Sequence, residues 1–214
     1  VEPANLTVRR ISSYCLIVPL PPSPDRVSAR RWTAAEVSVL EALKTCCERW
    51  GLHKVTIDDI AKESGVSRAT LYRIFPGGRD VVFEASRVYE LDRFFTKLLG
   101  RIGSAETLED LLVTAITCAI HELRNDEHLA IMLAAAPGEV VSEMTVEGLP
   151  RIIRVATAYL VPFVDPFLPR VEGRALIDIV ARLVISYFLV PSELVDLADE
   201  ESARAFIAPF LPAA

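Results

Sequence analysis

Residues 56–75 constrain the fold of this chain more than any other stretch. Apolar residues recur there at helical spacing on both sides of Gly65. A glycine at that point supplies the left-handed backbone that a sharp turn between two helices needs. The apolar positions are Ile57, Ile60 and Ala61 before the turn, and Val66, Leu71 and Phe75 after it. The stretch therefore predicts two short helices joined by a tight turn, which is the arrangement of a DNA-binding helix-turn-helix.

The caps of these two helices are also present in the sequence. Thr56 can cap the first helix through its hydroxyl, with Asp59 in the first turn, and Ser67 can cap the second helix. Because Leu71 and Phe75 face the core, the other residues near the start of the second helix turn outward. These outward residues are Arg68, Ala69, Thr70, Tyr72 and Arg73. A recognition helix presents this end to base edges in the major groove.

These residues resemble the hallmark of the tetracycline-repressor (TetR) family of bacterial transcriptional regulators. The matching positions are Ile60-Ala61, Gly65-Val66-Ser67, Thr70-Leu71-Tyr72, Phe75 and Arg79-Asp80. The resemblance is specific over about residues 33–85 and is one of general architecture beyond them. One departure is Pro76-Gly77-Gly78-Arg79, where the family more often has a polar residue or two before a lysine.

The resemblance implies an all-α homodimer that binds a palindromic operator as a one-component regulator, with repression more typical than activation. Under this hypothesis Arg68, Thr70 and Arg73 reach bases or adjacent phosphates. Thr56, Tyr72 and Arg79 then fix the register on the DNA backbone. The full set of candidate DNA-binding residues is Thr56, Ser67, Arg68, Ala69, Thr70, Tyr72, Arg73 and Arg79.

The distribution of charge agrees with a DNA-binding N-terminal part. The chain of 214 residues has a net charge of −6. Residues 1–80 hold 12 Lys and Arg against 9 Asp and Glu, whereas residues 81–214 hold 11 against 20. A basic part that touches phosphates and an acidic remainder with another task would give this asymmetry.

We predict three regions: an irregular extension at residues 1–30, a helix-turn-helix domain at 31–79, and a helical effector-binding and dimerisation domain at 80–214. The arginines of the extension could form a flexible arm that contacts phosphates. Arg9-Arg10 and the apolar run after them superficially resemble an export signal, which we reject because serines and a proline interrupt the run.

Helical periodicity predicts the remaining elements. A first helix begins at Thr33, which forms a capping box with Glu36, and runs to about Trp50. Trp32 and Trp50 are expected to be buried in the small N-terminal core. The further predicted helices are 80–100, which links the two domains, 106–124, 129–136, 171–190 and 199–210. No apolar run reaches the ~20 residues that span a bilayer, so we expect no membrane segment.

Prolines are expected to interrupt the helices of the C-terminal part, and the family resemblance adds an expectation about its last two helices. Pro137 is expected to stop the helix before it, and Pro150 and Pro162 are expected to break or kink helices within residues 139–165. The resemblance implies that the last two helices pair with those of a second subunit. The sequence itself shows only apolar residues there, which could equally be the core of a monomer.

No catalytic constellation, metal cluster or cofactor motif is recognisable, and we expect neither enzyme activity nor a cofactor. Cys118 and His121 could share a helical face, but Asn125-Asp126 is expected to end that helix before His128. The four cysteines do not form a disulfide pattern. We therefore expect a cytoplasmic protein that acts at the nucleoid.

The resemblance further implies a cavity between the linking helix and its neighbours that binds a small effector. Periodicity alone does not distinguish such a cavity from a filled core. Apolar lining would favour a largely apolar ligand, such as an acyl-CoA or a hydrophobic drug. The candidate lining residues are Phe94, Phe95, Leu98, Leu112, Ile116, Met132 and Tyr159.

Two other classes of function remain open at this point. One is a ligand-binding or enzymatic helical protein in which the N-terminal hairpin is incidental. The other is an architectural protein that binds DNA without sequence preference and has no effector.

Overall fold

The computed structural model describes residues 32–146 and 148–211, and their regular structure is entirely helical. The predicted all-α class is thereby confirmed. The predicted extension at residues 1–30 and its arm lie outside the described residues. Among the described residues, no helix combines the length and hydropathy needed to cross a membrane.

The N-terminal helices enclose a small apolar core. They are α1 (Ala34–Trp50), the 3-10 turn η2 (Leu52–Lys54), α2 (Ile57–Ser64), α3 (Arg68–Ile74) and the first part of α4 (Arg79–Ile102). Leu40, Ile60 and Leu71, from three different helices, are completely buried in this core. Helices of seven or eight residues are only marginally stable in isolation, so the core that they share with the other helices stabilises them.

Helix α1 begins and ends as predicted, but one of its aromatic residues does not lie where we expected. Thr33 and Glu36 form the capping box, and Gly51, at φ 81°, ends the helix. Trp32 packs edge-on against Tyr89 with ring centroids 5.4 Å apart. The expected burial of Trp50 was wrong, since it is 44% exposed at the last position of the helix.

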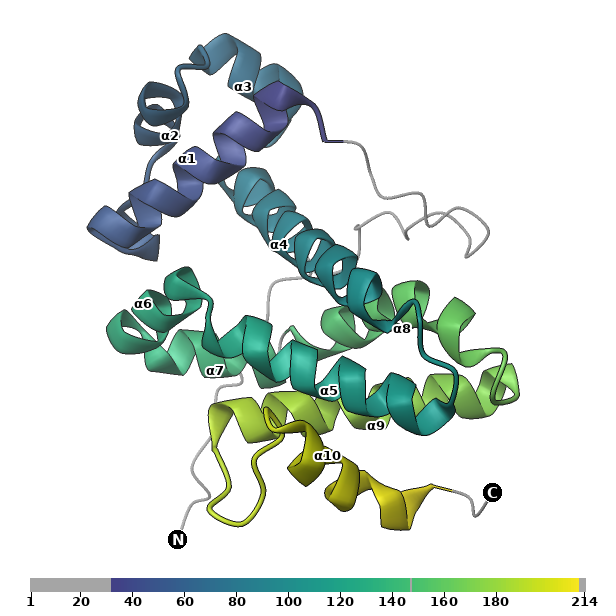
Figure 1. Cartoon of the computed structure of the whole chain (residues 1–214). Coiled ribbons are helices and arrows are strands. Elements are labelled where there is room, and N and C mark those ends of the chain that lie inside the picture. Colours follow the sequence, from purple (N-terminus) through teal and green to yellow (C-terminus); the bar gives the residue numbers. More distant parts are fainter. Residues whose placement is uncertain (1–31, 147, 212–214) are drawn as a thin grey trace, which may run out of the picture. The chain divides into compact units, whose positions relative to one another are not determined.

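Helix α4 runs from the N-terminal helices to the C-terminal helices (Figure 1). It contributes side chains to an apolar core in each part. Val82, Ala85 and Tyr89 are buried with the N-terminal helices. Phe95 and Leu98, further along α4, are buried with the C-terminal helices, as is Ile102 at its end. The predicted link between the two parts is therefore one continuous helix, and the domain division between residues 79 and 80 stays a prediction.

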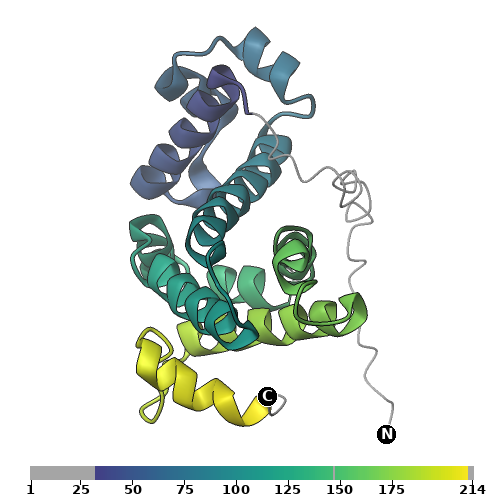
Figure 2. The ribbon, with the colours of Figure 1, turned by 45° about the vertical axis from the view of Figure 1, so that its right-hand side comes forward.

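The C-terminal helices pack around α5. They are α5 (Leu108–Arg124), α6 (Glu127–Ala135), α7 (Pro137–Thr145), α8 (Leu149–Val164), α9 (Arg170–Leu189), α10 (Glu200–Ile207) and the 3-10 turn η3 (Ala208–Phe210). Helix α5 contacts α4, α9 and α10, and α8 lies against α9 (Figures 1 and 2). Their shared core includes the completely buried Val113, Ile116 and Ile120 of α5.

Prolines open helices in this part more often than they break them. Pro137 follows the end of α6, as expected, but it also begins α7. Pro150 was expected to break or kink a helix and instead lies in the first turn of α8, whereas Pro162 lies inside α8 near its end. The first turn of a helix tolerates proline because the N–H groups there have no partner within the helix.

The connection between α3 and α4 depends on two glycines. Gly77 and Gly78 have φ values of 117° and 73°, which residues with a side chain rarely adopt. A Cβ on Gly78 would lie 3.1 Å from Cε1 of Tyr72, and a Cβ on Gly77 would lie 2.6 Å from Cγ2 of Val81. The Gly-Gly pair therefore holds the start of α4 close to α3.

Replacing Gly78 by alanine should destabilise the protein by about 1–3 kcal/mol, because the new Cβ adds backbone strain and crowds Tyr72. Gly100→Ala is the matched control, since Gly100 lies within α4 and its Cβ would meet no heavy atom of the described residues within 4 Å. The control should stabilise the protein by roughly 0.5–1 kcal/mol. Urea unfolding of both variants measures the difference, and equal effects would contradict the assigned role of Gly78.

Candidate nucleic-acid interface

The turn between α2 and α3 has the geometry that the sequence predicted. Gly65 adopts the left-handed conformation at φ 69°, and Ser67 caps α3 by accepting a hydrogen bond from the backbone N–H of Thr70. Leu71 and Phe75 are 0% and 2% exposed. The burial of these two side chains fixes which face of α3 is turned outward.

A capping box fixes the start of α2. The Thr56 hydroxyl donates to Oδ2 of Asp59 at 2.6 Å and accepts from the Asp59 backbone N–H at 3.3 Å. The Thr56 backbone N–H also donates to Asp59 Oδ2, at 2.9 Å. The side-chain hydrogen bond, and then the backbone one, hold the pKa of Asp59 below its usual value. Thr56 is therefore engaged as a cap, as predicted.

The outward face of α3 is rich in side chains that can contact DNA. Arg68, Ala69, Tyr72 and Arg73 are exposed there, and Thr70 is partly buried. The exposed Ser67 precedes them, and its hydroxyl donates to the Thr70 hydroxyl at 3.0 Å. The structure thus places the candidate residues of α3 along one short helix, from Arg68 in its first turn to Arg73 in its last.

Arg68 has a partner that the sequence did not reveal. Its guanidinium lies 3.0 Å from a carboxylate oxygen of Asp58, in the first turn of α2. Both side chains are more than 60% exposed, and an ion pair of this kind contributes little to stability. Arg68 can therefore leave Asp58 for another anion at small cost.

Arg79 also differs from expectation in its surroundings. Its Nε donates to the carbonyl oxygen of Val55 at 2.9 Å, and its Nη2 donates to that of Leu52 at 2.7 Å. The guanidinium carbon lies 4.3 Å from the centroid of the Phe83 ring. These contacts join the beginning of α4 to the segment before α2.

Ion pairs and hydrogen bonds connect α1 to the other helices. Arg49 pairs with Glu63 of α2 at 2.9 Å. On α4, Tyr89 and Arg93 both donate to Oε1 of Glu41, at 3.2 and 3.1 Å. These contacts brace α1 against the helix-turn-helix and against α4.

Two histidine–glutamate contacts connect the N-terminal helices to α6 and α7. His128 of α6 lies 3.2 Å from Glu48 of α1, and His53 of η2 lies 2.6 Å from Glu139 of α7. The helix-turn-helix part is thus held to the C-terminal helices by more than α4 alone.

Most of the candidate effector-binding residues lie in one apolar cluster, but one does not. Phe95, Leu98, Leu112 and Ile116 are buried in the C-terminal core, and Phe94 and Tyr159 pack against it. Met132 is buried on α6 outside that cluster, so the structure separates it from the other six.

A pair of aromatic rings joins α4 to α8 within this cluster. The rings of Phe95 and Tyr159 are stacked with centroids 5.4 Å apart, and the Tyr159 hydroxyl donates to Asp92. Burial, and then this hydrogen bond, raise the pKa of the Tyr159 hydroxyl.

The C-terminal core is closely packed between α5, α8 and α9. Its cavity between α5, α8 and α9 has a volume of about 20 Å³, which is close to the space that one water molecule occupies. Leu112 alone among the candidate lining residues contributes to its wall. The remaining wall residues are Leu111, Ala115, Leu160, Val164, Leu176, Ile177 and Val180. The core as it stands has no room for an acyl chain at this place.

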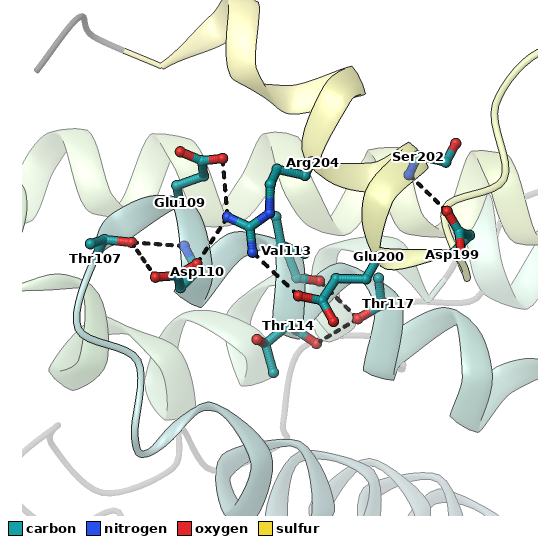
Figure 3. A network of polar contacts seen from close by, with 10 residues as sticks. All are labelled: Thr107, Glu109, Asp110, Val113, Thr114, Thr117, Asp199, Glu200, Ser202 and Arg204. Atoms are coloured by element: carbon teal, nitrogen blue, oxygen red, sulfur yellow. Dashed lines mark hydrogen bonds and ion pairs between the residues drawn. The ribbon is translucent and has the colours of Figure 1, made fainter.

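A larger hollow of about 340 Å³ lies at the surface beside α10 and is lined mainly by charged and polar residues. Arg204 of α10 spans one side of it and pairs with Glu109 and Asp110 of α5 and with Glu200 of α10 (Figure 3). This network attaches α10 to the first turn of α5. Its polar character does not match the apolar ligand that was predicted.

Among residues 32–146 and 148–211, no group of three or more His, Cys, Asp and Glu side chains is arranged to hold a metal ion. Cys118 and His121 lie on α5, which ends at Arg124, and Asn125 follows as the C-cap. His128 belongs to α6 and contacts Glu48. The helix break predicted at Asn125-Asp126 is therefore confirmed.

Known proteins resemble this chain in both sequence and structure. Residues 39–85 match the model of the family described as bacterial regulatory proteins, tetR family. An uncharacterized HTH-type transcriptional regulator of Mycobacterium tuberculosis strain H37Rv is 28% identical over 188 residues, covering 87% of this chain and 88% of that protein. The sequence similarity therefore extends well beyond the helix-turn-helix.

Among solved structures, the TetR family repressor AlkX from Dietzia sp. strain DQ12-45-1b, implicated in biodegradation of n-alkanes, has a TM-score of 0.62 at 25% identity. The match covers 84% of this chain and 96% of AlkX. The fatty acid degradation regulator FadR from Bacillus halodurans has a TM-score of 0.51 at 19% identity, covering 84% of this chain and 94% of FadR. At that identity the second likeness concerns the fold alone.

Proposed function

Because the chain is a TetR-family transcriptional regulator, we propose that it acts as a homodimeric repressor that binds a palindromic operator. The observation that carries this proposal is the exposed surface of α3, which presents the basic Arg68 and Arg73 together with Tyr72 and the small Ala69. Small and basic side chains on this surface let a recognition helix approach the floor of the major groove. Such a protein would act in the cytoplasm, at the nucleoid.

Each candidate residue has a role in this proposal that follows from its position. Arg68 and Arg73 can donate two hydrogen bonds to a guanine, and Thr70 can contact a base or a neighbouring phosphate. Thr56, at the start of α2, and Tyr72, exposed on α3, would contact phosphates, which sets the register. In a symmetric dimer the two α3 helices would enter successive major grooves about 34 Å apart or somewhat further.

Fluorescence anisotropy across a salt series tests the proposal. The duplexes are the intergenic DNA upstream of the protein's own gene and a scrambled sequence of the same composition. We expect tight binding to the first duplex and a clear ratio of affinities over the second. Equal, weak binding to both duplexes would reject a specific repressor of this operator.

The surface of the last helices supports the proposed dimer. Large apolar side chains that are more than 60% exposed occur along α9 and after it: Val171, Ile179, Val190, Leu194 and Phe210. Exposed apolar side chains favour association with another surface where they gather in one patch. We assign that surface to the same helices of a second copy, which would be related by a two-fold axis.

Ile179→Glu should raise the dissociation constant of the dimer by about tenfold or more. The Ile179 side chain is 61% exposed in the single chain, and in the proposed dimer a glutamate there would bury its charge. Ile131→Glu is the matched control, since Ile131 is also exposed but belongs to α6, which is not one of the last helices. Sedimentation velocity over a range of concentrations measures both variants. An unchanged dimer in Ile179→Glu would exclude this part of α9 from the interface.

The proposed effector is a small, largely apolar molecule such as an acyl-CoA or a hydrophobic drug. It would bind between α4, α5 and α8, where Phe94, Phe95 and Leu98 meet Leu112 and Tyr159. The likeness to AlkX, a repressor implicated in n-alkane biodegradation, supports an apolar ligand. A screen that begins with acyl-CoAs of increasing chain length and follows operator binding by anisotropy tests this. No change with any chain length would remove acyl-CoAs from consideration.

A further inference from the structure

Arg79 is placed to position the helix-turn-helix from the side of α4. It is the first residue of α4, and its side chain reaches back to the segment between α1 and α2. Nε and Nη2 donate to the carbonyl oxygens of Val55 and Leu52, at 2.9 and 2.7 Å. Val55 immediately precedes Thr56, which caps α2. One guanidinium therefore ties the beginning of α4 to the beginning of α2.

The other contacts of Arg79 hold the guanidinium in this orientation. Phe83, one turn further along α4, lies under it, and Nη1 is 3.6 Å from Oδ1 of Asp80. The side chain is 37% exposed. Two of its three nitrogens are committed to carbonyl oxygens and the third faces a carboxylate. A phosphate would have to compete with all three contacts.

The Gly77-Gly78 connection makes this geometry possible. The positive φ values of both glycines turn the chain so that α4 begins beside the carbonyl groups of Leu52 and Val55. Because α4 also contributes Phe95 and Leu98 to the C-terminal core, a shift of that core reaches Arg79 through one continuous helix.

We propose that Arg79 is a positioning residue that couples α4 to the start of α2, and that it does not contact a DNA phosphate. This proposal rests on the DNA-binding function proposed above. It replaces the direct phosphate contact that the sequence suggested for Arg79. Displacement of α4 would pull on the Leu52 and Val55 carbonyls, and so move Thr56 and the helix-turn-helix that follows.

The salt dependence of DNA binding separates the two roles. In Arg79→Ala we expect operator affinity to fall about ten- to hundredfold, because α2 loses its anchor. The slope of log affinity against log salt concentration should not change, since no phosphate contact is lost. A lost phosphate contact in each subunit would instead reduce the slope by about 2 for the dimer.

Arg79→Lys is the second variant. Lysine keeps the positive charge but lacks the planar fork that donates to two carbonyls at once. Under the proposal, this conservative substitution should not restore the affinity. A reduced slope in Arg79→Ala together with restored affinity in Arg79→Lys would overturn the proposal.

Hydrogen exchange of the DNA-free protein tests the coupling without reference to DNA. Backbone amides of residues 55–60 should exchange faster in Arg79→Ala than in Arg73→Ala, which removes the same charge from the exposed face of α3. Equal exchange in the two variants would refute the positioning role. Because this readout needs no operator, it also distinguishes failure of this proposal from failure of the proposed repressor function.

Discussion

Replacing Leu71 by alanine is expected to destabilise the protein by about 2–5 kcal/mol, as is usual for a buried leucine, and to abolish operator binding at physiological temperature. Leu71 is 0% exposed in the core formed by α1, α2, α3 and α4. The lost contacts are not replaced, because the surrounding side chains close only partly over the cavity. Helix α3 has seven residues and depends on this anchor.

Val146→Ala is the control, because the Val146 side chain is 79% exposed at the end of α7, outside the surface assigned to the dimer. Urea unfolding followed by circular dichroism should give a clearly lower midpoint for Leu71→Ala and an almost unchanged one for the control. Equal midpoints for the two variants would show that α3 is not held in the way the structure describes.

Arg73→Ala is expected to weaken operator binding by about 1–3 kcal/mol per subunit, which is roughly 5- to 150-fold for each half-site. Arg73 is exposed in the last turn of α3, and its removal leaves the folded core untouched. Because a dimer carries two copies, the losses should approximately add for two separate half-sites. Anisotropy titrations with the operator and the scrambled duplex measure the loss of operator affinity. They also show whether the ratio of affinities for the two duplexes falls.

Two further variants fix the interpretation of this result. Arg154→Ala removes the same charge from an exposed position on α8 and should leave operator affinity unchanged. Asp58→Ala should strengthen binding, because it frees Arg68 and removes a negative charge from the first turn of α2. If Arg154→Ala weakened binding as much as Arg73→Ala, net charge rather than α3 would explain the effect.

Local signals were sufficient to predict the caps and the turn of the helix-turn-helix. Thr33, Thr56 and Ser67 cap their helices, and Gly65 adopts the left-handed conformation, because each depends on neighbours within about four residues. The burial of Leu71 followed from helical periodicity. These are the features for which the nearby sequence contains the whole physical cause.

Features that depend on distant residues were not predictable in the same way. The carbonyl partners of Arg79 lie 24 and 27 residues earlier in the chain, and no spacing rule connects them. Trp50 is exposed although its residue type favours burial, because α1 ends there. Pro150 can open a helix or interrupt one, and only its neighbours in space decide between the two outcomes.

The close packing between α5, α8 and α9 has a consequence for the rate at which the proposed effector would bind if its site extended into this part of the core. With about 20 Å³ of empty space there, a molecule larger than water could enter only while these helices are transiently apart. Its observed rate of association would rise with effector concentration and then level off at the rate of helix opening. Substitutions that loosen this core would raise that limiting rate, even where they remove contacts to the effector. The packing of the protein itself would then set how fast the effector binds.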